Sequence, residues 1–110
     1  MKYTDEQRIK KIYEYAVSLW DYVSNNVDRS TLLTDIHMQW LVTTPLYNIG
    51  EQVYYLSDGF KKEHDSIDWI PIAGLRHRLV HDYDGTNWEI ISDVVYEEIP
   101  KLIEEVRKLM

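Results

Sequence analysis

The sequence predicts an all-α fold, an antiparallel bundle of four to five helices. Apolar residues recur at helical spacing through every long segment, and no segment shows the two-residue alternation of a strand. Capping motifs and turn residues divide the 110 residues into segments of helix length. The 45% hydrophobic content is enough for one core, so we expect a single domain over residues 1–110.

The first predicted helix runs from Thr4 to about Val23. Thr4 and Gln7 have the spacing of a capping box, and two acids follow Thr4, where the helix dipole favours negative charge. The apolar positions predict a core-facing side made of Ile9, Ile12, Tyr13, Ala16, Trp20 and Val23. The opposite side, which we expect to face solvent, carries Arg8, Lys10, Lys11 and Glu14.

A second helix is predicted from about Ser30 to Leu56. Pro45 falls in its middle and should kink or split it, because proline lacks a donor and clashes with the preceding turn. Ser57-Asp58-Gly59 should end this helix, and residues 61–65 are expected to form a polar connection.

Two further helices complete the bundle. The third covers roughly Asp68–His81, with Asp68 as a candidate cap and Pro71 in the first turn, where proline is tolerated. The last begins at a capping box of Thr86 and Glu89 and runs to the C-terminus, with a bend expected at Pro100 and the pairs Glu97–Lys101 and Glu104–Lys108 on its surface.

Composition excludes several classes of function. The net charge of −7 argues against a protein that coats nucleic acid, because affinity for phosphate comes from Lys and Arg. The absence of cysteine excludes disulfides and thiolate chemistry. The charged N-terminus is unlike a signal peptide and no apolar run is long enough to span a bilayer, so we expect no membrane association and a cytoplasmic location.

The segment GLRHRLVHDYDG, residues 74–85, concentrates basic and proton-transferring groups in an acidic chain. On a helical wheel Ile72, Leu75 and Leu79 form a core face, whereas Ile70, Gly74, His77 and His81 form a separate stripe. Glycine inside a helix costs about 1 kcal/mol relative to alanine and permits close backbone approach. The stripe therefore predicts contact with a partner helix, such as the same helix of a second copy.

Arg76 and His81 together suggest metal-independent RNA cleavage. A histidine moves protons near neutral pH, and an arginine holds a phosphate with two parallel hydrogen bonds. His81 would assist attack of the ribose 2′-OH on phosphorus, while Arg76 would stabilise the charge on the phosphoryl oxygens. The histidine of a second copy would act as the acid.

Other interpretations fit the same residues. His77 and His81 at i,i+4 could be half of a zinc site, although this spacing alone is a weak motif. Arg78 could be a solvated surface charge and Tyr83 a structural aromatic. Glu51 could orient a site or be structural.

The pattern Arg76, four residues, His81, one residue, Tyr83 resembles the HepT-like branch of the HEPN proteins. The resemblance extends to Asn48-Ile49-Gly50-Glu51, to Asp68-Trp69-Ile70-Pro71, and to the final helix with Trp88 near its start and Pro100 inside it. It covers most of the chain, from the second helix onward. The polar position after the arginine, more often asparagine in this branch, is His77 here.

The resemblance implies a helical bundle that dimerises through its motif-bearing helices. It implies an endoribonuclease toxin of a toxin–antitoxin pair, with Arg76 and His81 as the catalytic pair and His77 and Tyr83 as supporting residues. It also implies regulation by a minimal nucleotidyltransferase of the MntA type, which would transfer AMP to Tyr83. No metal or cofactor is expected. The alternative is a non-catalytic, substrate-binding partner subunit of such a nucleotidyltransferase.

Overall fold

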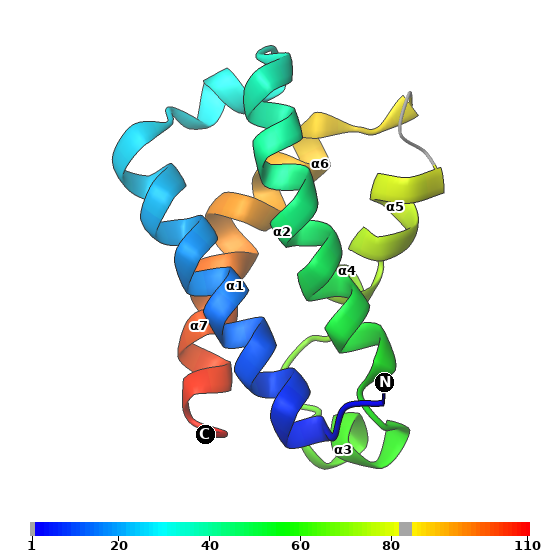
Figure 1. The fold of residues 1–110 in the computed structure, drawn as a ribbon. Coiled ribbons are helices and arrows are strands. Elements are labelled where there is room, and N and C mark those ends of the chain that lie inside the picture. The colour runs from blue at the N-terminus through cyan, green and yellow to red at the C-terminus, as the bar shows by residue number, and fades with distance from the viewer. Residues whose placement is uncertain (1, 82–84) are drawn as a thin grey trace.

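In the computed structural model, the described residues are 2–81 and 85–110, with side chains throughout except at positions 80 and 81. Two long antiparallel helices, α1 (Asp5–Asn26) and α2 (Ile36–Tyr55), lie side by side (Figure 1). α1 packs on its other side against α7 (Ile99–Arg107), and α2 packs against α4 (Ile70–Ala73) and α5 (Leu75–His81). No strand occurs in the described ranges, so the predicted all-α bundle is confirmed.

The start of α1 follows the prediction, but one of its side chains does not. The predicted capping box is present, with the Thr4 hydroxyl accepting from the backbone N–H of Gln7. Arg8, expected to face solvent, is only 9% exposed. Arg8 is buried because it lies on the core-facing side of the helix. Positions 8, 12, 16, 19 and 23 share that side. Four of them form a buried apolar stripe: Ile12, Ala16, Leu19 and Val23.

The second predicted helix is wrong at its start, whereas its end lies within one residue of the prediction. Residues Arg29–Leu33 form a 3₁₀ helix, η1, and α2 starts only at Ile36, where the Asp35 carboxylate accepts from two backbone N–H groups. Pro45 does not split α2, which continues to Tyr55. Ser57 then caps a short helix, α3 (Asp58–Glu63), in place of the expected polar connection.

The third predicted helix is divided at Gly74 into α4 and α5. Gly74 keeps right-handed helical angles and ends α4, while Trp69 rather than Asp68 precedes the first turn. The predicted core face is confirmed, since the side chains of Ile72, Leu75 and Leu79 are all buried. α5 therefore presents its apolar side to α2.

The final segment contains α6 (Trp88–Asp93), a π-helical turn η3 (Val94–Glu98) and then α7. Asn87, one residue after the predicted Thr86, caps α6 through hydrogen bonds from the N–H groups of residues 89 and 90. The π-helical turn immediately precedes Pro100, where a normal helix would set the proline ring against the carbonyl four residues earlier. Glu97 pairs with Arg29 instead of Lys101, and Glu104 pairs with Arg107 instead of Lys108.

At Gly50, α2 lies directly against the end of α4 and the start of α5. A Cβ atom there would lie 2.9 Å from the backbone nitrogen of Arg76, 3.1 Å from the carbonyl oxygen of Ile72 and 3.2 Å from Cβ of Leu75. Two of these atoms belong to the backbone, so a side chain could be admitted only by moving α5 away. Gly50 thus fixes how closely the helix that carries Arg76 approaches α2.

Replacing Gly50 with alanine should destabilise the fold. We expect Gly50→Ala to lose about 1–3 kcal/mol of unfolding free energy, the range found when a packed interior is overfilled. Gly59→Ala is the matched control, because a Cβ at Gly59 meets nothing within 4 Å. Urea melts of both variants test this, and equal midpoints for the two would contradict the packing argument.

Candidate functional site

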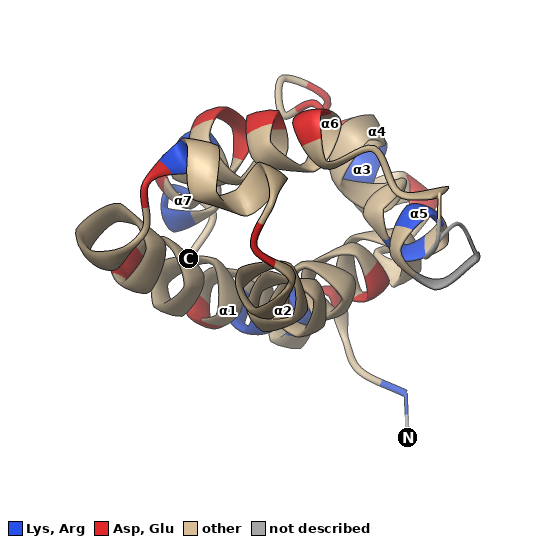
Figure 2. Cartoon of the chain, turned by 90° about the horizontal axis from the view of Figure 1, so that it is seen from above, with Lys and Arg blue, Asp and Glu red and all other residues tan. Residues whose placement is uncertain are grey.

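The predicted motif begins on α5, a basic helix that packs against α2. We call the contact between these two helices the α2–α5 seam. α5 has the sequence LRHRLVH, with two arginines and no acid, whereas acidic positions recur along α6 and the turns that follow it (Figure 2). His77 and Arg78 are exposed on its outer side. Arg76, one position earlier, is turned toward α2.

Arg76 is held by a carboxylate and by aromatic rings of α2. Its Nε donates to Oε2 of Glu51 at 3.1 Å, and its guanidinium carbon lies 4.5 Å from the Tyr54 ring centre and 5.6 Å from that of Tyr55. The hydrogen bond to Glu51 raises the pKa of Arg76, so the group stays charged. Because Glu51 follows Gly50, the same close approach that positions the backbone of α5 also places this ion pair.

Glu51 interacts with a second residue of its own helix. Its carboxylate, chiefly through a hydrogen bond, raises the pKa of Tyr47, and Arg76 opposes that effect. The carboxylate of Glu51 therefore interacts with both the phenol of Tyr47 and the guanidinium of Arg76. Sequence reasoning left Glu51 outside the predicted site, and the structure places it at the centre of the contacts made by Arg76.

This arrangement leaves Arg76 able to bind an anion. The Arg76 side chain is 35% exposed, compared with 23% for that of Glu51. A guanidinium carries five N–H donors in a planar fork, and the Glu51 carboxylate accepts from Nε. The remaining donors suit a phosphate, whose oxygens match the geometry of the fork.

The other predicted site residues are placed only in part. His77 lies on the exposed side of α5, and His81 is the last residue of that helix, but its side chain lies outside the described residues, as does Tyr83 altogether. The structure therefore brings Arg76 together with Glu51 and does not test its pairing with His81. A Cβ at Gly74 would approach only the carbonyls of the preceding turn, so no packing between described elements of this chain explains that glycine.

Among the described residues, no three His, Cys, Asp or Glu side chains gather as a set of metal ligands. Within the same ranges, no helix is both long and apolar enough to cross a membrane.

The Tyr47–Glu51 contact gives a measurable signature. In Glu51→Gln the amide carries no charge and accepts more weakly, so we expect the pKa of Tyr47 to fall toward its ordinary value of about 10. NMR titration of ¹³Cζ-labelled tyrosine in the folded protein measures this. Tyr96 is an internal control, because burial is the main cause of its raised pKa. A Tyr47 pKa that is unchanged in the variant would show that Glu51 does not engage the phenol.

Comparison with known proteins identifies the family. Residues 6–109 match the family described as Ribonuclease HepT-like. A probable ribonuclease HepT of Thermococcus cleftensis is 29% identical over 99% of this chain and 98% of its own length. A protein of Methanocaldococcus jannaschii, provisionally named an RNase, is 31% identical over 90% of the chain and 84% of its own length.

A further match is shorter. A provisionally named RNase of Caldanaerobacter subterraneus subsp. tengcongensis is 39% identical over 56% of this chain, and the match spans only 55% of that relative. No solved structure matches the chain significantly. The family and the enzyme class predicted from the motif are confirmed by these matches: the chain belongs to the HepT-like ribonuclease family.

Proposed function

We propose that this protein is a metal-independent endoribonuclease that acts as the toxin of a toxin–antitoxin pair. The observation that carries the proposal is the placement of Arg76, a charged and partly exposed guanidinium held at the α2–α5 seam by Glu51 and by two tyrosine rings. Arg76 binds the scissile phosphate and His81 is the general acid–base group. His77 assists by hydrogen bonding.

The chemistry is a transesterification within the RNA strand. The neutral imidazole of His81 takes the proton of a ribose 2′-OH, whose oxygen attacks the adjacent phosphorus. The bond from phosphorus to the 5′ oxygen breaks, and that oxygen takes a proton from the imidazolium of a second copy. Arg76 stabilises the charge that develops on the non-bridging oxygens. The products are a 2′,3′-cyclic phosphate and a 5′-hydroxyl.

The outer side of α5 supports a two-fold assembly through the motif-bearing helices. Ile70, at the start of α4, is 81% exposed, and on a helical wheel Gly74 and His77 continue its stripe toward α5. A large apolar side chain beside a glycine suits close contact between two helices. In a homodimer built on this stripe the two motif helices lie together and supply one histidine each.

Regulation acts at Tyr83, which follows His81 by two residues and helps to position the substrate. A minimal nucleotidyltransferase of the MntA type transfers AMP to its hydroxyl. The added phosphate brings bulk and negative charge to the mouth of the site, where it repels RNA by like charge.

Loss of either catalytic side chain should abolish cleavage. We expect His81→Ala and Arg76→Ala to reduce the rate at least about 100-fold, the usual range for removal of an acid–base group or a charge-stabilising donor. Protein expressed without a partner is mixed with total RNA in excess chelator, and fragment ends are analysed for cyclic phosphate. Arg78→Ala is the matched control, since Arg78 is an exposed arginine on the same helix.

The outcomes separate the two functional candidates. Cleavage that persists in His81→Ala would refute the catalytic assignment. No cleavage by wild-type protein that mass spectrometry shows to be unmodified would favour the other candidate, a non-catalytic binding subunit of a nucleotidyltransferase.

Modification should depend on one hydroxyl. We expect Tyr83→Phe to cleave RNA but to gain no AMP, measured as a mass increase, when incubated with the nucleotidyltransferase and ATP. Tyr55→Phe is a control for modification at another partly exposed tyrosine. AMP incorporated equally into both variants would place the acceptor elsewhere.

A further inference from the structure

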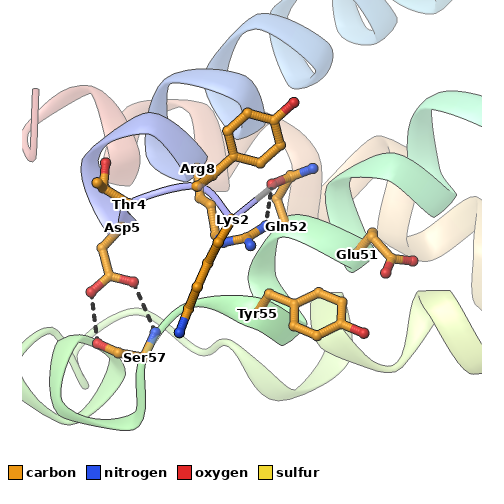
Figure 3. Close-up of a pocket in the computed structure, with 9 residues that line it drawn as sticks. Lys2, Thr4, Asp5, Arg8, Glu51, Gln52, Tyr55 and Ser57 are labelled. Carbon is orange, nitrogen blue, oxygen red and sulfur yellow. Dashed lines mark hydrogen bonds between the residues drawn. The ribbon is translucent and has the colours of Figure 1, made fainter.

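A pocket of about 790 Å³ lies beside Arg76, between the start of α1 and the C-terminal part of α2 (Figure 3). Its walls include Lys2, Tyr3 and Arg8 from the N-terminal segment, and Glu51 and Tyr55 from α2. None of the positions from the N-terminal segment belongs to the predicted catalytic motif.

Arg8 is the central cation of this pocket. Its Nη1 donates to Oε1 of Gln52 at 2.8 Å, and within the described part of the chain no carboxylate forms an ion pair with it. The guanidinium carbon lies 5.5 Å from the Tyr3 ring centre and 5.3 Å from that of Tyr55. A largely buried guanidinium without a carboxylate partner keeps its full charge for an incoming anion.

The pocket shares two of its lining residues, Glu51 and Tyr55, with the surroundings of Arg76. The ring of Tyr55 is 49% exposed and has the guanidinium of Arg8 at 5.3 Å and that of Arg76 at 5.6 Å from its centre. The Tyr3 ring, which contacts Arg8, also contacts Lys11, whose ammonium lies 4.6 Å from the ring centre. Cations and aromatic rings thus alternate from Tyr54 and Arg76 to Tyr3 and Lys11.

The acids that line the pocket are already engaged. Both oxygens of Asp5 accept hydrogen bonds from Ser57, at 2.8 Å from the backbone N–H and 2.6 Å from the hydroxyl, and these bonds lower the pKa of Asp5. Glu51 is paired with Arg76. Because Arg76 offsets Glu51, the cations Lys2 and Arg8 face only the charge of Asp5 among the lining acids, and this local balance favours an anion despite the acidic net charge of the chain.

We propose that this pocket is a subsite for single-stranded RNA, which binds a stretch of the substrate away from the scissile phosphate. Arg8 and Lys2 contact backbone phosphate, and the exposed ring of Tyr55 stacks a base. Interleaved cations and aromatic rings are the usual means by which proteins hold single strands without reading their sequence. The inference rests on the proposed function, since it extends the same substrate past Arg76.

Binding of an uncleavable strand tests the subsite. The probe is a 12-nucleotide 2′-O-methyl RNA, which has no 2′-OH to attack, compared with the corresponding dinucleotide by fluorescence anisotropy. We expect Lys2→Gln and Arg8→Gln each to weaken binding of the long strand about tenfold and to lower the salt slope by about 0.7. The loss should be smaller for the dinucleotide, whose single phosphate cannot occupy Arg76 and Arg8 at the same time.

Two controls keep the result interpretable. Lys101→Gln removes the same unit charge from an exposed position of α7 and should bind like wild type. Arg8 joins α1 to α2, so the folding of Arg8→Gln is checked by thermal melting, whereas Lys2 precedes α1 and its loss cannot unfold the bundle.

Each outcome bears on one proposal. If Lys2→Gln and folded Arg8→Gln bind the long strand as Lys101→Gln does, the subsite is refuted even when RNA is cleaved, and Arg8 is only a link between helices. If the length-dependent loss appears but wild-type protein cuts no RNA, the subsite stands and the catalytic proposal fails.

Discussion

The close approach of α5 to α2 at Gly50 is the constraint on which the candidate site depends. A side chain at that position would meet the backbone nitrogen of Arg76. With nothing but hydrogen on Gly50, the start of α5 lies against α2, and the guanidinium of Arg76 reaches the next residue of α2, Glu51, and the rings one turn farther on. The functional side chains are therefore positioned by core packing, with Leu75 and Ile72 buried beneath them. Any change that separates the two helices would move the guanidinium away from its carboxylate and its aromatic supports together.

Local electrostatics reconcile an acidic chain with a phosphate-bearing substrate. The net charge of −7 repels RNA over most of the surface, which limits unspecific binding. Near Arg76 and the adjoining pocket the balance is reversed, because Arg76 offsets Glu51, and Lys2, Arg8 and Lys11 outnumber Asp5. The negative faces of the tyrosine rings hold the guanidinium groups but carry no net charge. A carboxylate in the same place would neutralise the guanidinium. A protein arranged in this way attracts a phosphate at one place and rejects it elsewhere.

Sequence reasoning identified the fold class and the family, and it failed where two local signals compete. Helical spacing predicted the buried faces of α1 and α5, because the residues on the buried side of a helix recur every three to four positions. The prediction missed the helix starts capped by Asp35 and Asn87 and the short helix capped by Ser57, since each cap lies near another plausible one and only the tertiary path of the chain decides between them. Arg8 was assigned to solvent from its charge although its spacing from Ile12 and Ala16 places it on the buried side. The burial of Arg8 could thus have been predicted from its spacing. By contrast, nothing in the sequence distinguishes Tyr54 and Tyr55 from the other seven tyrosines as the rings that contact Arg76.

The geometry of a helix also gives a physical reason for the proposed two-fold site. His81 follows Arg76 by five positions, which on a regular helix places the two roughly 140° apart around the axis. Arg76 is directed to α2. By sequence spacing, position 81 falls on the stripe of Ile70, Gly74 and His77, and this stripe includes the most exposed large apolar side chain described. In the proposed mechanism, a phosphate on Arg76 and a proton acceptor at position 81 would meet at the edge of α5, where a second copy of the helix would bring its own histidine. Dimerisation would in this way complete the catalytic centre and cover Ile70 in the same step.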